Sequence, residues 1–257
     1  MKYKIVIADV DGTMIAPGAS HLETASPRLI ETVEKTKKLG VIFSLATARS
    51  LDKIEGLIKS LKLNSLIILN NGASIYDCMV EKYIFNSFIP LKTVEEITEL
   101  LKQYPYTFYI DGIGKRIEYN PQKGFPLNEI IKIVILHIQP FQAQQVFEAV
   151  YKNNKVRVTK SISGISPVKE SIHITNIDAT KEKAAKRIAD LSGVNMGQIL
   201  TIGDSYNDFS LMSSSGFKVA MGNAVPEIKA IADYIAPGYD EDGVAQTLEE
   251  FILKNNE

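Results

Sequence analysis

The stretch Ile5-Val6-Ile7-Ala8-Asp9-Val10-Asp11-Gly12-Thr13 decides which fold the sequence predicts. Its first four residues are apolar and three of them are β-branched, which is typical of a strand buried on both faces. The strand runs directly into Asp9 and Asp11, and in open α/β sheets ligands bind beyond the carboxyl ends of the strands. Taken alone, the Asp-Gly pair is equally well explained as a turn that ends the strand.

Similar units follow along the chain. Ser26-Pro27 predicts the start of a helix, with serine as the N-cap and proline at the first helical position. Residues 41–46 and 66–69 predict two further buried strands with a helix between them. This alternation favours right-handed crossovers and a parallel sheet. The polar residues after each strand are then expected along one edge of that sheet.

The pattern changes from about Tyr83. A charged helix is expected over residues 93–103, and an antiparallel hairpin is expected around Asp111-Gly112. This α+β order of helices and strands predicts that residues 83–176 form a second domain inserted into the first. Residues 1–82 and 177–257 are therefore predicted to form a Rossmann-like α/β core, and the insert is predicted to be an α+β domain.

The α/β pattern then resumes. Thr180-Lys181 predicts the start of a helix, and residues 199–202 predict a buried strand. That strand runs into Gly203-Asp204-Ser205-Tyr206-Asn207-Asp208. Asp204 and Asp208 are four residues apart, so their side chains share a face if a helical turn begins there.

Together the polar residues at these strand ends predict a catalytic site. Four carboxylates are expected near one another, those of Asp9, Asp11, Asp204 and Asp208. That much negative charge favours a divalent cation, and Mg²⁺, which keeps several waters, is expected to contact only some of the four. Hydrogen-bond donors suited to phosphoryl oxygens stand opposite the acids, namely Thr47, Lys181 and Asn207. Acids, metal and donors together indicate phosphoryl transfer.

The order of these motifs resembles that of the haloacid dehalogenase superfamily. The segments that carry the resemblance are Asp9-Val10-Asp11-Gly12-Thr13, then Thr47, then Lys181, then Gly203-Asp204-Ser205-Tyr206-Asn207-Asp208. The sequence is most similar to the Cof-type branch of sugar-phosphate phosphatases, whose cap domain is inserted between the second and third motifs. The predicted insert lies at that place, so the resemblance implies that it is a cap that selects the substrate.

The resemblance also implies roles for individual residues. Asp9 would be the nucleophile that forms an aspartyl-phosphate, and Asp11 would act as general acid and then general base. The phosphoryl group would be bound by Thr47, Ala48, Arg49, Lys181 and Asn207. Mg²⁺ would be held by Asp9, Asp204 and the backbone carbonyl of Asp11, with Asp208 supporting the metal or Lys181.

Two positions depart from the family pattern. The second motif often reads Thr-Gly-Arg, and here Ala48 replaces the glycine; the third often reads Lys-Gly, and here Glu182 follows Lys181. The N–H of Ala48 can still reach a phosphate if its φ is negative, whereas Glu182 adds an acid near the phosphate pocket. Both departures bear on substrate contacts more than on the chemistry.

Composition limits the partners. With 29 basic and 30 acidic residues the net charge is −1, which predicts no binding to nucleic acid or to an anionic membrane. Cys78 is the one cysteine, which excludes an internal disulfide and suits a reducing compartment. No signal peptide is recognisable, so a cytoplasmic location is expected. The expected partner is a small phosphate ester, and the expected protein is a monomer or homodimer.

The leading hypothesis is thus a Mg²⁺-dependent phosphatase acting on a small phosphorylated metabolite, such as a sugar phosphate or phosphoglycolate. A phosphomutase of the same superfamily is the nearest alternative, because it would use the same motifs and differ in the cap. A non-catalytic sensor of phosphorylated ligands is a third possibility. Every motif residue is present, which favours an enzyme.

Overall fold

The computed structural model describes residues 2–120, 122, 128–163 and 166–254. The chain divides into two compact units, unit 1 with Met1–Ile84 and Thr180–Glu257, and unit 2 with Phe85–Ala179. The sequence places the boundaries of the insert at 83 and 176, within a few residues of this division. The chain thus leaves unit 1 once, forms unit 2, and returns.

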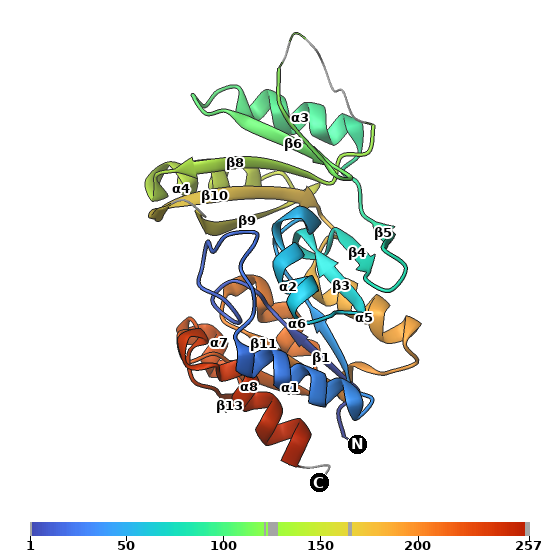
Figure 1. Cartoon of the computed structure of the whole chain (residues 1–257). Coiled ribbons are helices and arrows are strands. Elements are labelled where there is room, and N and C mark those ends of the chain that lie inside the picture. The colour runs from blue at the N-terminus through green and yellow to red at the C-terminus, as the bar shows by residue number, and fades with distance from the viewer. Residues whose placement is uncertain (1, 121, 123–127, 164–165, 255–257) are drawn as a thin grey trace. The chain divides into compact units, whose positions relative to one another are not determined.

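A parallel sheet forms the centre of unit 1 (Figure 1). In the described part of the chain it has five strands in the order β13-β12-β11-β1-β2, and every neighbouring pair is parallel. The strands are β1 (Ile5–Ala8), β2 (Ile42–Leu45), β11 (Ile199–Gly203), β12 (Phe217–Ala220) and β13 (Tyr234–Ile235). The predicted parallel α/β sheet is confirmed.

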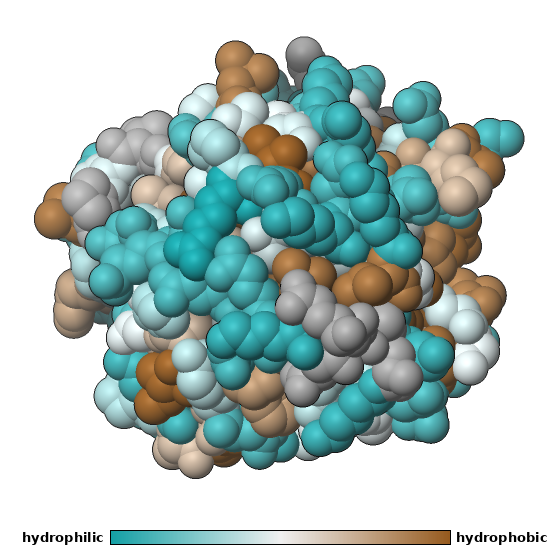
Figure 2. Space-filling model, turned by 60° about the horizontal axis from the view of Figure 1, so that its bottom comes forward, coloured by the Kyte–Doolittle hydropathy of each residue, from teal (hydrophilic) through white to brown (hydrophobic). Residues whose placement is uncertain are grey.

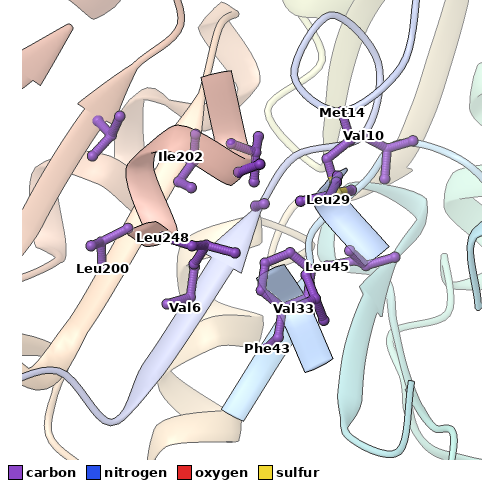
Figure 3. Close-up of a cluster of buried hydrophobic side chains, with 14 of the residues drawn as sticks. Val6, Val10, Met14, Leu29, Val33, Phe43, Leu45, Leu200, Ile202 and Leu248 are labelled. Carbon is purple, nitrogen blue, oxygen red and sulfur yellow. The ribbon is translucent and has the colours of Figure 1, made fainter. Parts of the chain in front are cut away.

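Helices accompany this sheet. They are α1 (Pro27–Lys38), α2 (Glu55–Ser60), α5 (Lys181–Leu191), α6 (Phe209–Ser214), α7 (Pro226–Ile231) and α8 (Gly243–Leu248), which continues as a π-helical turn over Glu249–Leu253. Ser26 caps α1 as predicted, because its side chain accepts the N–H of Leu29. Apolar residues of the sheet and of two helices share one core (Figure 3). Val6, Phe43 and Ile202 come from β1, β2 and β11, Val33 comes from α1, and Leu248 comes from α8.

The strand β3 (Leu66–Leu69) differs from its prediction. The sequence predicts it as a further strand of the parallel sheet, but it pairs antiparallel with β4 (Ser74–Asp77) in a sheet that also contains β5 (Lys82–Asn86). An isolated parallel bridge between Ala46 and Ile68 joins the end of β3 to the chain after β2. Two serine side chains also connect β2 with β3 and the residue before it. The Ser44 hydroxyl donates to the carbonyl of Leu66 at 2.7 Å, and the Ser65 hydroxyl donates to the carbonyl of Phe43 at 2.6 Å.

A left-handed turn causes this change of partner. Asn70, Asn71 and Gly72 follow β3 with φ values of 51°, 57° and 96°. Asparagine and glycine are the residues that tolerate this region best. Three such residues in succession reverse the chain, so β4 returns along β3 instead of a helix crossing over.

Unit 2 has the predicted α+β organisation. Its strands are β6 (Phe108–Gly112), β7 (Lys115–Glu118), β8 (Lys132–Ile138), β9 (Val156–Ser163) and β10 (Ser166–Asn176), in the order β7-β6-β8-β10-β9. Each strand in this order is antiparallel to its neighbours. Two helices, α3 (Leu91–Leu101) and α4 (Pro140–Tyr151), share an apolar core with one face of this sheet.

The distribution of hydrophobic residues is visible on one face of the molecule and along its helices. On the face shown in Figure 2, hydrophobic residues lie scattered among hydrophilic ones. Across the described residues, every helix is too short or too polar to cross a bilayer.

Candidate active site

Three carboxylates meet at the carboxyl ends of β1 and β11. Asp9 follows β1 and Asp204 follows β11, and these strands are parallel neighbours with Ala8 opposite Ile202. One carboxylate oxygen from each of Asp9, Asp204 and Asp208 lies within 4.8 Å of the others. The parallel pairing of β1 with β11 therefore brings together acids that lie about 195 positions apart in the sequence.

Lys181 lies against this cluster. Its Nζ donates to Oδ1 of Asp9 at 2.6 Å and to Oδ1 of Asp208 at 2.7 Å. The lysine is 1% exposed and the two acids are 5% and 2% exposed. Charges removed from water to this extent are stable only with close partners, so the ammonium and the two carboxylates hold one another in place.

Burial and repulsion raise the pKa values of Asp9 and Asp204. Burial is the main cause that raises the pKa of Asp9 well above its usual value, although Lys181 opposes the shift. Burial, followed by the charge of Asp208, raises the pKa of Asp204 to about 7. For Lys181 burial lowers the pKa, but the charges of Asp208 and Asp9 outweigh burial and raise it overall. One ammonium thus does not neutralise the cluster.

Glycines allow the acids to approach this closely. Gly12 has φ +74°, and a Cβ there would lie 2.4 Å from Oδ2 of Asp204. A Cβ on Gly203 would lie 2.7 Å from the carboxyl carbon of Asp208. Thr13 follows Gly12 and donates its hydroxyl to Oδ1 of Asp204 at 3.1 Å. Both glycines are needed because a side chain at either position would displace a carboxylate.

The four-residue spacing of Asp204 and Asp208 has a local cause. A short 3₁₀ turn over Tyr206–Asp208 reverses the chain, so the side chain of Asp208 reaches the backbone of Asp204. Oδ2 of Asp208 then accepts the backbone N–H groups of Asp204 and Ser205 at 3.2 and 3.1 Å. Its other oxygen remains directed at Lys181, so Asp208 links the turn to the lysine.

The turn after β3 fixes the start of α5, which carries Lys181. A Cβ on Gly72 would lie 2.1 Å from the carbonyl oxygen of Thr180. Thr180 itself caps α5 by accepting the N–H of Lys183. Asn71 accepts a hydrogen bond from the side chain of Asn207 at 3.1 Å, which ties the same turn to the segment after β11.

Asp11 is held apart from the buried carboxylates. Among the described residues, the cluster consists of Asp9, Asp204 and Asp208, and the Asp11 side chain lies outside it. Its Oδ1 and Oδ2 accept two hydrogen bonds from Arg49, at 2.7 and 2.8 Å. Oδ1 also accepts the N–H of Gly18 at 3.1 Å. The expected contact of Asp11 with a metal uses its backbone carbonyl and stays a prediction.

The expected phosphate ligands occupy different positions. Thr47 is fully buried, and its hydroxyl oxygen accepts the N–H of Arg49 at 3.1 Å. Ala48 is not among the described residues with positive φ, so alanine fits there without strain. The guanidinium of Arg49 contacts Asp11, and the amide of Asn207 contacts Asn71. Glu182 lies in the first turn of α5, where a negative charge is favoured by the helix dipole.

Three residues of this region have roles that the sequence does not assign. Thr13, Asn71 and Gly72 contact or support residues of the predicted site. The left-handed turn at Asn71 and Gly72 could be inferred from the sequence, since Asn-Asn-Gly after a strand indicates left-handed backbone. Nothing in the sequence pattern shows that this turn packs on the start of a helix more than 100 positions later.

The acidic cluster has the chemistry of a divalent cation site. Its donors are carboxylate oxygens, the ligands preferred by Mg²⁺ and Ca²⁺. The raised pKa values of Asp9 and Asp204 reflect burial and mutual repulsion that a nearby divalent cation would relieve. The residues present therefore fit a divalent metal.

Comparison with known proteins agrees with this geometry. The family model of haloacid dehalogenase-like hydrolases matches residues 6–248. The chain is 26% identical over 253 residues to the 5-amino-6-(5-phospho-D-ribitylamino)uracil phosphatase of Bacillus subtilis, covering 97% of this chain and 96% of that one. It is 24% identical over 258 residues to a phosphoglycolate phosphatase of Methanosarcina acetivorans, with 99% of each chain covered.

Solved structures show the same fold. A haloacid dehalogenase-like hydrolase from Bacteroides thetaiotaomicron superposes with a TM-score of 0.80 at 24% identity, covering 97% of this chain and 100% of that one. One from B. subtilis gives a TM-score of 0.82 at 19% identity, covering 97% and 100%. The fold class and the superfamily resemblance are confirmed, and the enzyme class, phosphoric monoester hydrolase, is supported. With the family model matched from residue 6 to residue 248, this chain belongs to the haloacid dehalogenase-like hydrolase family.

Proposed function

We propose that the protein is a Mg²⁺-dependent phosphatase that hydrolyses a small phosphorylated metabolite through an aspartyl-phosphate on Asp9. The observation that carries this proposal is the buried contact of Lys181 with Asp9 and Asp208 beside Asp204. A carboxylate can attack an anionic ester only where nearby positive charge offsets the repulsion. The relatives named as phosphatases support the same reaction class.

The residues divide the reaction between them. In the first half Asp9 attacks phosphorus, and Asp11 gives a proton to the leaving oxygen as the ester bond breaks. In the second half Asp11 takes a proton from the water that attacks phosphorus, and the bond to Asp9 breaks. Splitting the displacement in this way replaces one difficult step by two easier ones.

Lys181 and the polar strand ends bind the phosphoryl group. The ammonium of Lys181 contacts Asp9 directly, so it also favours the charged form of the nucleophile and orients it. The Thr47 oxygen accepts from a backbone N–H and keeps its own hydrogen for a phosphoryl oxygen. Mg²⁺, held by Asp9, Asp204 and the carbonyl of Asp11, would supply charge stabilisation for the transferring group.

Unit 2 is proposed to be the cap that selects the substrate. Support comes from its insertion between the segment of Thr47 and that of Lys181, and from its own fold. The relatives are named for phosphoglycolate and for a 5-phospho-D-ribitylamino uracil, and these names support a small phosphorylated metabolite as the proposed substrate.

The test is release of inorganic phosphate from a panel of sugar phosphates, phosphoglycolate, nucleotides and pyridoxal phosphate, with Mg²⁺ or with chelator. We expect release from at least one ester with Mg²⁺ only, and loss of release in Asp9→Asn. Absence of release from every ester with Mg²⁺ present would overturn the proposal. Analysis of the organic product shows whether phosphate instead moves to a second oxygen of the substrate, as in a mutase.

A further inference from the structure

We propose that Arg49 is a positioning residue that fixes the carboxyl group of Asp11, and that it does not bind the phosphate of the substrate. The inference rests on the proposed function, because it concerns the residue that exchanges protons in that reaction. It departs from the role that the sequence resemblance implies for Arg49.

The hydrogen bonds of the guanidinium carry this inference. An arginine has five N–H donors in a fixed planar arrangement. Nε and Nη2 of Arg49 each donate to Asp11, and Nη2 also donates to the carbonyl of Ala19 at 2.8 Å. Nη1 donates to the carbonyls of Lys53 at 2.9 Å and Ser20 at 3.5 Å. Five bonds use the five donors, so binding a phosphate would require Arg49 to leave partners it already has.

The same contacts order the surroundings of Asp11. The Arg49 side chain is 12% exposed, and it joins three segments: the end of β1, the loop of residues 18–20 and the turn ending at Lys53. The N–H of Gly18 donates to Oδ1 of Asp11 from the same loop. A planar two-bond contact between guanidinium and carboxylate fixes the orientation of both groups more firmly than a lysine would.

The pattern of bonds also selects one oxygen of Asp11 for proton transfer. Oδ1 accepts two described hydrogen bonds, from Arg49 and Gly18, whereas Oδ2 accepts one, from Arg49. A carboxylate oxygen has two lone pairs, so Oδ2 keeps a position for the proton. The Asp11 side chain is 32% exposed, which leaves it reachable by a leaving group or a water. The contacts of Arg49 and Gly18 thus leave Oδ2 as the oxygen with more room for a proton.

Leaving-group dependence tests this role. A p-nitrophenyl ester has a leaving oxygen that needs no protonation, whereas glycerol 1-phosphate has an alkoxide leaving group that does. General acid catalysis contributes about 10²–10⁴-fold. We expect Arg49→Gln to lower kcat/KM for glycerol 1-phosphate about 100-fold more than for p-nitrophenyl phosphate. The inhibition constant of inorganic phosphate should stay within about 3-fold of wild type, a change below 1 kcal/mol.

Other variants separate positioning from a general loss of structure. Arg49→Lys should restore part of the activity on the alkyl ester, because lysine keeps one charged contact. Asp11→Asn should show the same dependence on the leaving group, and adding Arg49→Gln to it should cause little further loss. The control is Arg28→Gln, which removes an exposed arginine that pairs with Glu249 and should change neither ester's hydrolysis. If Arg49→Gln does not fold, Arg49→Lys takes its place in the comparison.

A second readout does not depend on turnover. Amide hydrogen exchange at residues 18–20 should accelerate in Arg49→Gln, since the loop loses its contacts with the guanidinium. An equal loss on both esters, or a tenfold weaker inhibition by phosphate, would overturn the positioning role. A wild type that hydrolyses neither these esters nor any ester of the panel overturns the proposed function itself, so the two failures are distinguishable.

Discussion

The Nζ of Lys181 lies 2.6 Å from Oδ1 of Asp9, although 172 positions separate them in the sequence. The same Nζ contacts Asp208, and all three residues are buried. The Lys181 ammonium offsets the charge of two buried carboxylates, and in the proposed reaction the same charge would permit attack on an anionic ester.

Removing this ammonium should destabilise the fold. Lys181→Met leaves Asp9 and Asp208 buried without their cation, and breaking a buried ion pair costs about 3–5 kcal/mol. Chemical denaturation without metal gives the free energy of unfolding. The matched control is Lys38→Met, which breaks an exposed pair with Glu34 and should cost under about 1 kcal/mol. Equal losses in both variants would contradict this account.

Metal binding should depend on pH through Asp204. Burial and the charge of Asp208 raise the pKa of Asp204 from its ordinary value of 3.8 to about 7 in the folded protein. The folded state then binds more protons than the unfolded state between these values, so this group's contribution to stability falls as pH rises from about 4 to 7. Under the proposed function, Mg²⁺ would bind the charged form of Asp204 and relieve this loss. The shift of the melting temperature by Mg²⁺ should therefore be larger at pH 8 than at pH 5.5.

Thermal melting with and without Mg²⁺ over this pH range measures the effect. Asp204→Asn should remove most of the shift, since it removes a charged ligand that is expected to hold the metal. A shift that is the same at both pH values would show that Asp204 does not compete between proton and metal.

His173 should make the protein less stable in acid. Burial, with smaller effects of Lys132 and Arg116, lowers its pKa to about 3. The unfolded state gains a proton near pH 6.5 while the folded state does not, so stability falls as pH drops from about 6.5 to 3. The limiting slope is about 1.4 kcal/mol per pH unit. His173→Gln should flatten the dependence measured by denaturation, whereas His21→Gln, at an exposed position, should leave it unchanged.

Alanine variants of two glycines distinguish the cost of backbone strain from the cost of a steric clash. Gly72 and Gly40 both have positive φ. A Cβ on Gly72 would lie 2.1 Å from the Thr180 carbonyl oxygen, whereas a Cβ on Gly40 would have no described non-neighbouring atom within 4 Å. Alanine should cost about 1–2 kcal/mol of strain at either position. Gly72→Ala should cost more and should also lower kcat, because it displaces the residue before Lys181.

Denaturation and phosphate release measure the two effects of the glycine variants. Gly40→Ala should keep wild-type kcat. If Gly72→Ala also keeps it, the turn after β3 does not position Lys181.

Much of the fold was predictable because its signals are local. The apolar run before Asp9 indicates a buried strand, Ser26-Pro27 begins a helix, and alternation of such units implies a parallel sheet. These signals depend on residues within a few positions of one another. They also place the acids at strand ends, which is why Asp9 and Asp204 could be expected near each other.

The pairing of β3 was not predictable in the same way. Leu66–Leu69 is as apolar as β1, yet it pairs with β4 because the following residues adopt left-handed backbone. Apolar strands look alike whether their neighbour is parallel or antiparallel, and the deciding Asn-Asn-Gly turn lies outside the strand.

The sequence alone determines which residues follow each strand, and hence the set of acids and donors of the candidate site. Tertiary structure decides which of them contact one another. Lys181 joins Asp9 and Asp208, whereas Arg49 binds Asp11 and Asn207 binds Asn71. The physical reason is that hydrogen-bond partners depend on the register of the sheet and on the turns between segments far apart in the chain, whereas strand and helix patterns arise from near neighbours.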